Sequence, residues 1–295
     1  MNDIGEKELL NIINEFRIFV NEFSGYLNDR EGYWTLRGFI DIAKNIYSIS
    51  SDTKLISKAL EIMIIPLIHD FFIKRGLKVI LSPEQNYYPD ISILKNDIKI
   101  ALDIKTSYRL PSSATEISGF TLGAFTGYFR DRNSSKNVVF RYNEYIKHYV
   151  LGIIYSDLFK NEKEMKDIDL EEQQPWLMPD IFTIEQIKEL KTPIKDIEFI
   201  LYEKWKLASD SPGSGNTKNI GSIKNIDKIK RGEGVFTIFG NEGENIFNDY
   251  WMYYLTNDMA RKAELLKPPY RNLKEYLEYR GKVNLLRKLE EYYER

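Results

Sequence analysis

Two short apolar runs, residues 91–94 and 98–106, are separated by the polar tripeptide Lys95-Asn96-Asp97. Both runs are rich in β-branched residues and have the length of strands rather than of helices. Apolar runs of this kind on either side of a short polar turn predict a β-hairpin. We interpret the rest of the chain around this hairpin, because its ends carry the residues best suited to chemistry.

Three ionisable side chains stand at one end of the predicted hairpin. Asp90 opens the first strand after Pro89, and the second strand ends in Asp103-Ile104-Lys105. Successive side chains of a strand point to opposite faces, so Asp103 and Lys105 project to the same face. Pairing of the strands can bring Asp90 beside them. The sequence therefore predicts two carboxylates and a lysine at the rim of an apolar sheet.

This trio suits metal-assisted hydrolysis of a phosphodiester. Carboxylate oxygens are natural ligands of Mg²⁺, which keeps water and substrate phosphate among its ligands. A bound metal ion lowers the pKa of a water molecule and neutralises charge in the transition state. A neighbouring lysine can orient that water or stabilise the developing charge. The other interpretation is a hairpin whose polar residues only mark strand ends, and the spacing leaves both open.

A second segment satisfies the same loose pattern, so the pattern by itself is weak. A proline–aspartate pair at 179–180 is followed by Glu189-Leu190-Lys191. The residues between them have helical periodicity, and Thr183 is suited to cap a helix there. The strand context must therefore carry the inference for the hairpin.

Helical periodicity marks two long segments before the hairpin. The first covers residues 5–23. It carries one apolar stripe, formed by Leu9, Ile13, Phe16, Val20 and Phe23. The second begins after Ser51 or Asp52, either of which can cap it, and ends near Gly76. Pro66 is expected to kink or divide this second helix, because proline lacks the amide hydrogen that continues the helical ladder.

The downstream pattern predicts the remaining strands and helices of a single α/β (α+β) domain spanning residues 1–295. We expect a strand, turn and helix start over 120–130, a strand over 138–140, a helix over 143–158, a strand over 196–207, a helix over 246–262 and a C-terminal helix over 274–295. Residues 159–195 are charged and then proline-bearing, and they resemble an insertion on the scaffold. Residues 209–223 are small, polar and rich in glycine, which is typical of a loop.

Composition excludes several classes of protein. Apolar residues make up 43% of the 295 residues and charged residues 29%, which is ordinary for a globular protein. No apolar run reaches the length of a membrane span, and the N-terminus lacks the pattern of a signal peptide. The absence of cysteine excludes disulfides, thiol catalysis and cysteine-bound zinc, and it fits the reducing cytoplasm in which we expect the protein to act.

Histidine and one isolated glutamate bear on the metal chemistry. The two histidines, His69 and His148, are too few for a histidine-rich metal site, and each stands in a segment that we expect to be helical. Glu61 stands among apolar residues of the second predicted helix. Carboxylates are rarely left in such surroundings without a partner, so we expect Glu61 at the surface edge or turned toward a metal ion or another cation.

Charge is segregated along the chain although the net charge is only −2. Basic residues dominate 216–231, whereas acidic residues dominate 157–172. A binding cleft needs such segregation, but solvated loops also show it, so the pattern favours neither interpretation.

The glycine-rich loop, residues 209–223, has the chemistry of a nucleic-acid reader. Its backbone amides could cradle a phosphate, but no Gly-Lys-Ser/Thr sequence ends it, so it is not a Walker A motif. Asn216 can bond adenine bidentately in the major groove, Thr217 can touch a thymine methyl group, and the glycines let the backbone approach base edges. A flexible surface loop is the alternative interpretation.

Several islands of sequence belong together when their order and spacing are considered. They are SDTK (51–54), Glu61, QNYYPD (85–90), IALDIKTSY (100–108), FTLGAFTGYFR (120–130), GSGNTKNIGSI (213–223), DYW (249–251) and YRN (270–272). This set closely resembles the EcoRV family of type II restriction endonucleases, in the PD-(D/E)XK nuclease superfamily. The resemblance covers most of residues 51–281, is loose before residue 51 and is absent from much of 159–195. The glycine-rich loop is its specific motif.

The resemblance implies a homodimeric nuclease with a restriction-endonuclease-like fold, a central mixed β-sheet flanked by helices. Such an enzyme cuts both strands of a palindromic site in double-stranded DNA and uses Mg²⁺. Residues 1–50 would form a dimerisation-type region, and residues 209–223 would be the DNA-recognition loop.

The same resemblance assigns catalytic roles. Asp90 and Asp103 would be metal ligands, and Glu61 would be an auxiliary carboxylate that also binds metal. Lys105 would orient the attacking water or stabilise charge.

DNA contacts are also implied. The residues that would read bases are Gly213, Gly215, Asn216 and Thr217 in the major groove and Gln85 and Asn86 in the minor groove. Those that would contact the DNA backbone are Thr106, Ser107, Lys136, Lys218, Asn219 and Arg261. The expected site is GATATC with a blunt cut at its centre, where the pyrimidine–purine TA step is easily kinked.

Three positions, Glu84, Tyr87 and Lys218, depart from the family's residues. None is an expected major-groove reader, so they bear on flanking preference or affinity. A cognate DNA methyltransferase is expected as a partner that protects host sites. Two alternatives stay open: a sequence-specific DNA-binding protein on a nuclease scaffold without cleavage activity, and an unrelated metal-dependent hydrolase of small phosphoesters.

Overall fold

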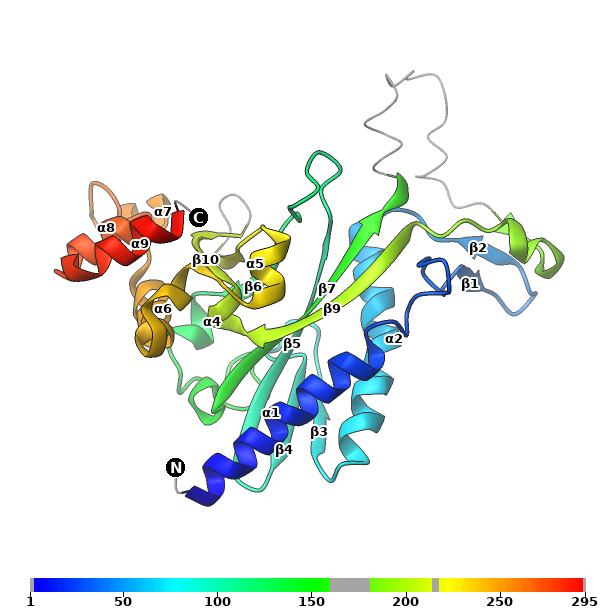
Figure 1. The fold of residues 1–295 in the computed structure, drawn as a ribbon, viewed down its shortest axis with the longest axis horizontal. Helices are drawn as coiled ribbons and strands as arrows, with labels where there is room; N and C mark the ends of the chain where they lie inside the picture. The colour runs from blue at the N-terminus through cyan, green and yellow to red at the C-terminus, as the bar shows by residue number, and fades with distance from the viewer. Residues whose placement is uncertain (1–2, 160–180, 214–217, 294–295) are drawn as a thin grey trace. The chain divides into compact units, whose positions relative to one another are not determined.

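The computed structural model describes residues 3–159, 181–213 and 218–293 (Figure 1). Its helices are α1 (Asp3–Phe23), α2 (Thr53–Ile73), α4 (Lys204–Leu207), α5 (Ile226–Arg231), α6 (Gly243–Tyr253), α7 (Asn257–Lys262), α8 (Leu273–Tyr279) and α9 (Leu286–Tyr293). Its strands are β1 (Gly38–Ile40), β2 (Ile46–Ser48), β3 (Lys78–Leu81), β4 (Ile91–Lys95), β5 (Ile98–Tyr108), β6 (Thr121–Ala124), β7 (Lys147–Asp157), β8 (Ile181–Phe182), β9 (Ile194–Glu203), β10 (Ala208–Pro212) and β11 (Asn219–Ser222). Short 3₁₀ helices are η1 (Gly127–Phe129), η2 (Tyr142–Glu144), η3 (Ile184–Glu189), η4 (Val235–Glu242) and η5 (Val283–Leu285).

The strands form three sheets, and the largest one is the mixed sheet expected for this chain. It contains five strands in the order β3-β4-β5-β7-β9. Two three-stranded sheets have the orders β1-β2-β8 and β10-β11-β6. The α/β class predicted from the sequence is therefore confirmed. Among the described residues, no helix is both long enough and apolar enough to cross a membrane.

Contacts within the chain divide it into two compact units, each assembled from separate segments. The first unit contains residues 1–78, 106–118 and 152–201, and the second contains 79–105, 119–151 and 202–295. Because each unit draws on the beginning, middle and later parts of the chain, the division does not follow consecutive domains. The organisation as a single domain stays a prediction.

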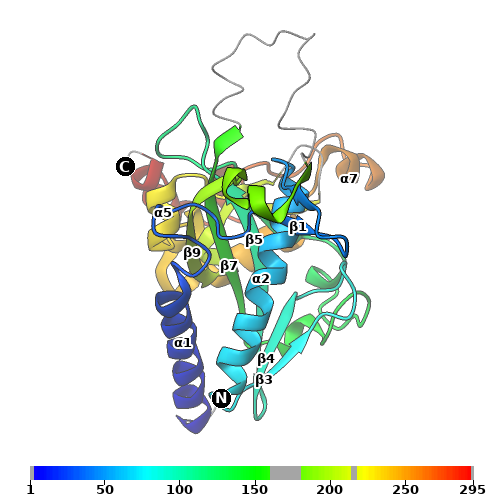
Figure 2. The same cartoon turned by 90° about the vertical axis from the view of Figure 1, so that its right-hand side faces the viewer.

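The first unit contains α1 and α2, which run side by side (Figure 2). Phe16 and Phe19 of α1 contact Phe72 of α2, with ring centroids 4.9 and 5.9 Å away. The fully buried apolar residues of α1 are Leu9, Ile12, Phe16 and Phe19. Of the predicted stripe, Leu9 and Phe16 are buried, whereas Ile13, Val20 and Phe23 are only half-buried. The buried face follows the alternating spacing of three and four residues, which keeps side chains directed at one neighbouring helix.

α2 continues through Pro66, so the helix is not divided there, and the alternative of a kink stays a prediction. Asp52 caps the helix as expected, since its Oδ1 accepts hydrogen bonds of 2.9 Å from the amides of Lys54 and Leu55. A proline removes only one backbone donor. Burial of most of one side of α2 compensates for it, through Ile56, Ala59, Leu60, Ile64, Ile68, Phe71 and Phe72.

β7 departs most from the sequence-based expectation. The pattern predicts a helix over 143–158, but residues 147–157 form a strand. Every residue from 149 to 155 is buried, so no alternation of polar and apolar positions distinguishes this strand from a buried helix. The strand expected over 138–140 is only an isolated bridge between Val138 and Tyr88.

The predicted helices at the carboxyl end are each divided. The one expected over 246–262 becomes α6 and α7, and the C-terminal helix expected over 274–295 becomes α8, η5 and α9. Gly281 lies between α8 and η5 and has a φ of +68°. Glycine adopts this left-handed conformation more easily than other residues, and it is common where a helix ends. The strand expected over 196–207 ends at Glu203, and α4 follows it.

Candidate active site

The β4–β5 hairpin has the form predicted from the sequence. Its strands pair antiparallel with Ile91 opposite Leu102 and Lys95 opposite Ile98. The two-residue turn contains Asn96 with a φ of +50°, a conformation that asparagine tolerates well. In this register the residue before Ile91 and the residue after Leu102 are neighbours. Asp90 and Asp103 are brought together for that reason.

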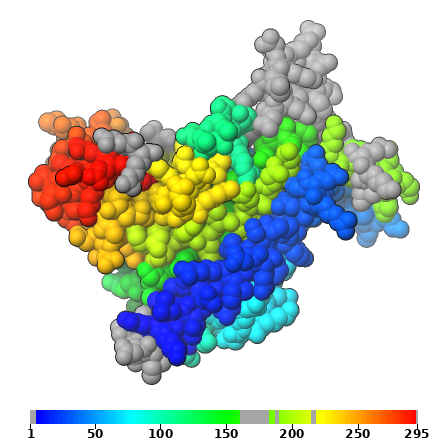
Figure 3. Space-filling view, in the orientation of Figure 1, coloured from blue at the N-terminus to red at the C-terminus, as the bar shows by residue number. Residues whose placement is uncertain are grey.

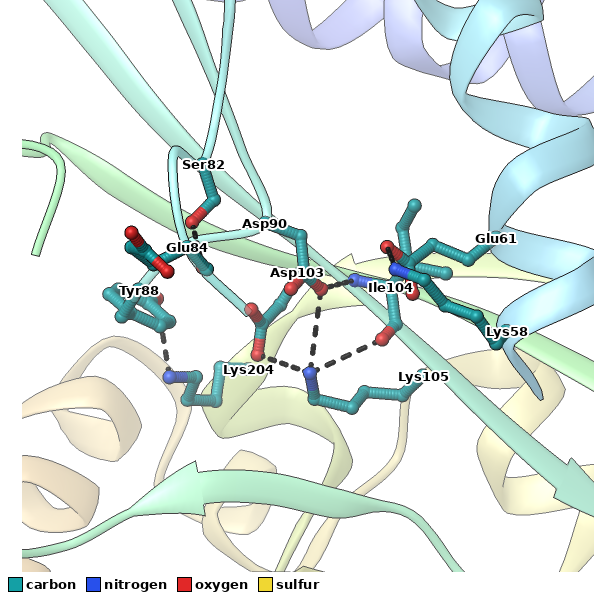
Figure 4. A network of polar contacts seen from close by, with 10 residues as sticks. All are labelled: Lys58, Glu61, Ser82, Glu84, Tyr88, Asp90, Asp103, Ile104, Lys105 and Lys204. Atoms are coloured by element: carbon teal, nitrogen blue, oxygen red, sulfur yellow. Dashed lines mark hydrogen bonds and ion pairs between the residues drawn. The ribbon is translucent and has the colours of Figure 1, made fainter. Parts of the chain in front are cut away.

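Lys105 joins the two aspartates. Its Nζ lies 2.8 Å from Oδ2 of Asp103 and 3.6 Å from Oδ2 of Asp90 (Figure 4). The amide of Ile104 donates a hydrogen bond of 2.7 Å to Oδ2 of Asp90, and Lys105 Nζ donates one of 3.2 Å to the Ile104 carbonyl. Both carboxylates therefore converge on a single cation.

Charge interactions outweigh the cost of burial for Asp103 and Lys105. Burial raises the pKa of Asp103, but the positive charges of Lys105 and Lys204 overcome it and lower the pKa below the usual range. Burial lowers the pKa of Lys105, but Asp103 and Asp90 raise it above that of a free lysine. Asp103 is thus ionised and Lys105 is protonated at neutral pH.

This donor set fits a hard divalent cation. The two carboxylate oxygens already converge on one positive charge, and oxygen ligands are those that Mg²⁺ prefers. In the part of the chain that the structure describes, no group of three or more histidines, aspartates and glutamates is gathered to hold a metal. The two carboxylates of Asp90 and Asp103 suit a cation that keeps water or phosphate oxygens among its other ligands.

Lys204 is a member of the cluster that the sequence analysis missed. It begins α4, is 2% exposed, and donates a hydrogen bond of 3.2 Å from Nζ to Tyr88 Oη. Its ammonium lies 4.2 Å from the centroid of the Tyr88 ring. Burial lowers the pKa of Lys204 to about 8, although Asp103 opposes the shift. No motif marks this residue in the sequence; a lysine at the end of an apolar run is the available signal.

Tyr88 connects Lys204 to an aromatic group. Its Oη lies 2.9 Å from Nδ1 of His148, and its ring stacks on that of Tyr128 at 4.8 Å. His148 stacks on Tyr142 at 4.0 Å. His148 was expected on a helix and lies instead on β7. Burial and the nearby positive charge of Lys204 hold the pKa of His148 well below its usual value, so it is neutral.

Glu61, the predicted auxiliary carboxylate, belongs to α2 in the first unit. Its Oε1 lies 2.7 Å from Lys58 Nζ, and its side chain is 29% exposed. Glu61 was expected either at the surface edge or turned toward a cation, and its partner in the structure is the ammonium of Lys58. Its role as a metal ligand stays a prediction, because the two aspartates belong to the second unit.

The stem of the predicted recognition loop is a pair of irregular strands in the second unit. β10 and β11 pair antiparallel with a register shift between Ala208 and Pro212. The Gly213 amide donates a hydrogen bond of 2.9 Å to the Asn219 carbonyl, and the Lys218 carbonyl accepts one of 2.9 Å from Phe125. The predicted base readers Gly215, Asn216 and Thr217 lie outside the described residues.

The other predicted DNA contacts occur in both units. Gln85, Asn86, Lys136 and Arg261 are exposed residues of the second unit. Arg261 forms an ion pair with Asp258. Thr106 and Ser107 belong to the first unit, where Thr106 Oγ1 lies 2.5 Å from Ser57 Oγ. Ser107 is buried, and its hydroxyl has no hydrogen-bond partner among the described residues.

Comparison with known proteins gives concordant results. The family model described as "Restriction endonuclease EcoRV" matches residues 30–281. The chain is similar to the type II restriction enzyme EcoRV of Escherichia coli, with 33% identity over 251 residues, which cover 83% of this chain and 91% of that protein. The matched range contains the hairpin, the loop stem and Lys204, and it ends before α9.

Proposed function

The chain belongs to the EcoRV restriction endonuclease family and is an EcoRV-like type II restriction endonuclease, a DNA phosphodiesterase; on this premise we propose its site and chemistry. The proposed reaction is Mg²⁺-dependent hydrolysis of both strands at GATATC, with a blunt cut at the central TA step. The convergence of Asp90 and Asp103 on Lys105 is the observation that supports the chemistry. The sequence island at 213–223 supports the site.

In the proposed mechanism, Asp90 and Asp103 would hold the metal ion through their carboxylate oxygens. When bound, the ion supplies Lewis-acid chemistry and lowers the pKa of a water molecule. Lys105 carries a full charge, so it can donate a hydrogen bond to the attacking water or to a phosphate oxygen as negative charge develops. Asp103 is already ionised at neutral pH because its pKa is lowered, so it need not lose a proton before its oxygens act as ligands.

Recognition is proposed to divide between the two grooves of DNA. Gly213, Gly215, Asn216 and Thr217 would read the major groove, and Gln85 and Asn86 the minor groove. Backbone contacts would come from Thr106, Ser107, Lys136, Lys218, Asn219 and Arg261, with Glu61 assisting the metal ligands. Gly221 supports close strand packing in the loop stem, since a Cβ there would meet the Ser211 carbonyl at 2.6 Å.

A homodimer is proposed because a palindrome presents two equivalent scissile bonds related by a two-fold axis. The β1–β2 hairpin exposes apolar side chains, with Ile40 at 63%, Ile42 fully exposed and Phe39 at 40%. Exposed apolar groups of this kind are typical of a surface that another chain covers. This supports residues 1–50 as the dimerisation region. A cognate DNA methyltransferase completes the proposed system.

Digestion of a plasmid of known sequence tests the proposal directly. The enzyme is incubated with Mg²⁺ and, separately, with EDTA, and the fragment ends are sequenced. Blunt ends inside GATATC that disappear with EDTA are the expected result. Discrete cuts at another sequence would refute the proposed site and direct attention to Glu84 and Lys218, whereas specific binding without cutting would refute the proposed chemistry.

A further inference from the structure

The carboxyl-terminal residues after 281 lie outside the family match, yet they are packed into the second unit. η5 and α9 form this segment. Leu285 and Leu289, one helical turn apart, are 8% and 3% exposed and anchor it. Most other side chains of the segment are exposed (the red surface in Figure 3). An extension with two buried anchors and a polar outer face is a docked structural element.

The end of α9 reaches the first strand of the recognition-loop stem. Asp210 lies in β10, and its Oδ2 accepts hydrogen bonds from Tyr293 Oη at 3.4 Å and from the Leu273 amide at 2.9 Å. The Asp210 carbonyl accepts a third from Tyr250 Oη at 2.6 Å. Three helices, α6, α8 and α9, thus hold one residue that stands a few positions before the predicted base readers of the loop.

The same helix also holds the segment that follows the second strand. Tyr292 Oη donates a hydrogen bond of 3.0 Å to the Glu233 carbonyl, just after α5. Lys228 of α5 places its Nζ 3.9 Å from the centroid of the Tyr292 ring, and that Nζ donates a 3.5 Å hydrogen bond to the Tyr292 carbonyl. α5 follows β11 after a short connection. α9 therefore contacts structure on both sides of the stem.

The stem needs such support because its own pairing is irregular. β10 and β11 share a short ladder with a register shift, and β11 and β6 show another shift between Asn219 and Gly221. Short, irregular ladders hold the strand direction weakly. Reading of base edges requires side chains held within about 0.5 Å of their productive positions. Small movements of the stem would therefore reduce discrimination between bases.

We propose that α9 is a positioning element for DNA recognition, in which Tyr292 and Tyr293 brace the two sides of the recognition-loop stem. This inference rests on the proposed role of the loop in reading bases. It concerns residues that lie beyond the matched range of the EcoRV family model, which ends at residue 281. The brace would act on the choice of site, since the contacts of Tyr292 and Tyr293 are with β10 and with the segment that contains α5 and Glu233.

The test compares the full-length enzyme with the double variant Tyr292→Phe/Tyr293→Phe, which keeps both rings and removes only the two hydroxyls. A second variant ends at Gly281. Arg287→Ala is the matched control, because Arg287 is on the same helix and its side chain is 89% exposed. Steady-state kcat and KM are measured on short duplexes that contain the preferred site or a site with one base pair changed.

The double variant is expected to lose about tenfold in the ratio of kcat/KM between the two duplexes. Its kcat on the preferred duplex should stay within about twofold of wild type. Truncation should reduce the ratio at least as much, and Arg287→Ala should leave it unchanged. If the two hydroxyls had a purely structural role, their loss would lower the stability of the protein and slow cleavage of both duplexes alike. Thermal unfolding measured in parallel would reveal the loss of stability.

An unchanged ratio of kcat/KM between the two duplexes in the folded double variant would overturn the inference. Equally slower cleavage of both duplexes would also overturn it. If the truncated protein does not fold, the double variant still decides the question. Failure of the wild type to cut any discrete site would refute the proposed function, and the inference with it. Specific cutting by wild type with an unaltered variant would refute the inference alone.

Discussion

Lys105 Nζ lies 2.8 Å from Oδ2 of Asp103, a residue that is only 4% exposed. This pair explains why a buried aspartate remains ionised, because the lysine charge offsets the loss of solvation. It also means that a cation already stands where the carboxylates converge. The consequences for catalysis, stability and binding can each be measured.

Asp103→Ala is expected to abolish cleavage, with a loss of at least about 10³-fold, while sequence-specific binding survives. The substitution removes one of the two carboxylates that we propose as metal ligands and leaves the proposed DNA-reading loop intact. Cleavage and gel-shift assays on the same duplex measure the two effects. Asp97→Ala, in the exposed turn of the same hairpin, is the control and should retain activity. Near-normal cutting by Asp103→Ala would refute the catalytic assignment.

Because burial lowers the pKa of Lys204, loss of its proton should make the protein more stable as the pH rises through weakly alkaline values. Its pKa is about 8 in the folded protein against 10.5 for a free lysine, so the unfolded chain binds more protons between these values. Stability therefore increases with pH across that interval, by about 3 kcal/mol in total, and the contribution levels off above it.

Urea unfolding of wild type and Lys204→Met at a series of pH values measures this contribution. The difference in free energy of unfolding between the two proteins should change in favour of wild type from about pH 8 to 10.5. Comparison with the variant cancels the titration of other lysines and tyrosines. If the difference in free energy of unfolding between the two proteins did not change with pH, folding would not lower the pKa of Lys204.

Lys136→Ala should weaken DNA binding nearly uniformly, whatever the sequence of the duplex. A lysine that contacts a phosphate carries no base information and acts through the release of counterions. Affinity measured at several salt concentrations should give a log–log slope less steep by about 0.9. Lys7→Ala, an exposed lysine of α1, should leave the slope unchanged. Loss of discrimination between sites in Lys136→Ala would contradict a pure backbone contact.

Ile42→Asp should dissociate the proposed dimer, because it places a charge on the exposed apolar surface of the β1–β2 hairpin. Sedimentation should show a monomer at concentrations where wild type is dimeric, and double-strand cutting should fall about tenfold or more. Leu266→Asp is the matched control, since Leu266 is equally exposed but lies outside residues 1–50. A variant that stays dimeric would exclude this hairpin from the interface.

The β4–β5 hairpin, our candidate active site, could be predicted from the sequence because its determinants are local. A two-residue polar turn fixes the register of short β-branched strands, and the register alone brings Asp90 opposite Asp103. The projection of Asp103 and Lys105 to one face follows from the period of a strand. The arrangement of these residues could therefore be predicted without information on contacts between distant parts of the chain.

Other elements depended on contacts that the sequence pattern does not contain. β7 is buried on both faces, so its apolar run gives no period, and only its neighbours in the sheet make it a strand. Pro66 remains inside α2 because packing of that helix compensates for one missing donor. Lys204 reached the active-site cluster through the packing of α4, which no spacing rule connects to Tyr88.

The sequence by itself thus determined the β4–β5 hairpin, the family resemblance and the α/β class, since these follow from local periodicity and from motifs in order. Only the tertiary structure decided which residues surround the hairpin and what the carboxyl-terminal helix contacts. Tyr293 and Asp210 are far apart in the chain and meet through folding of the whole second unit. Such contacts arise from the summed burial of many side chains, which no short segment encodes.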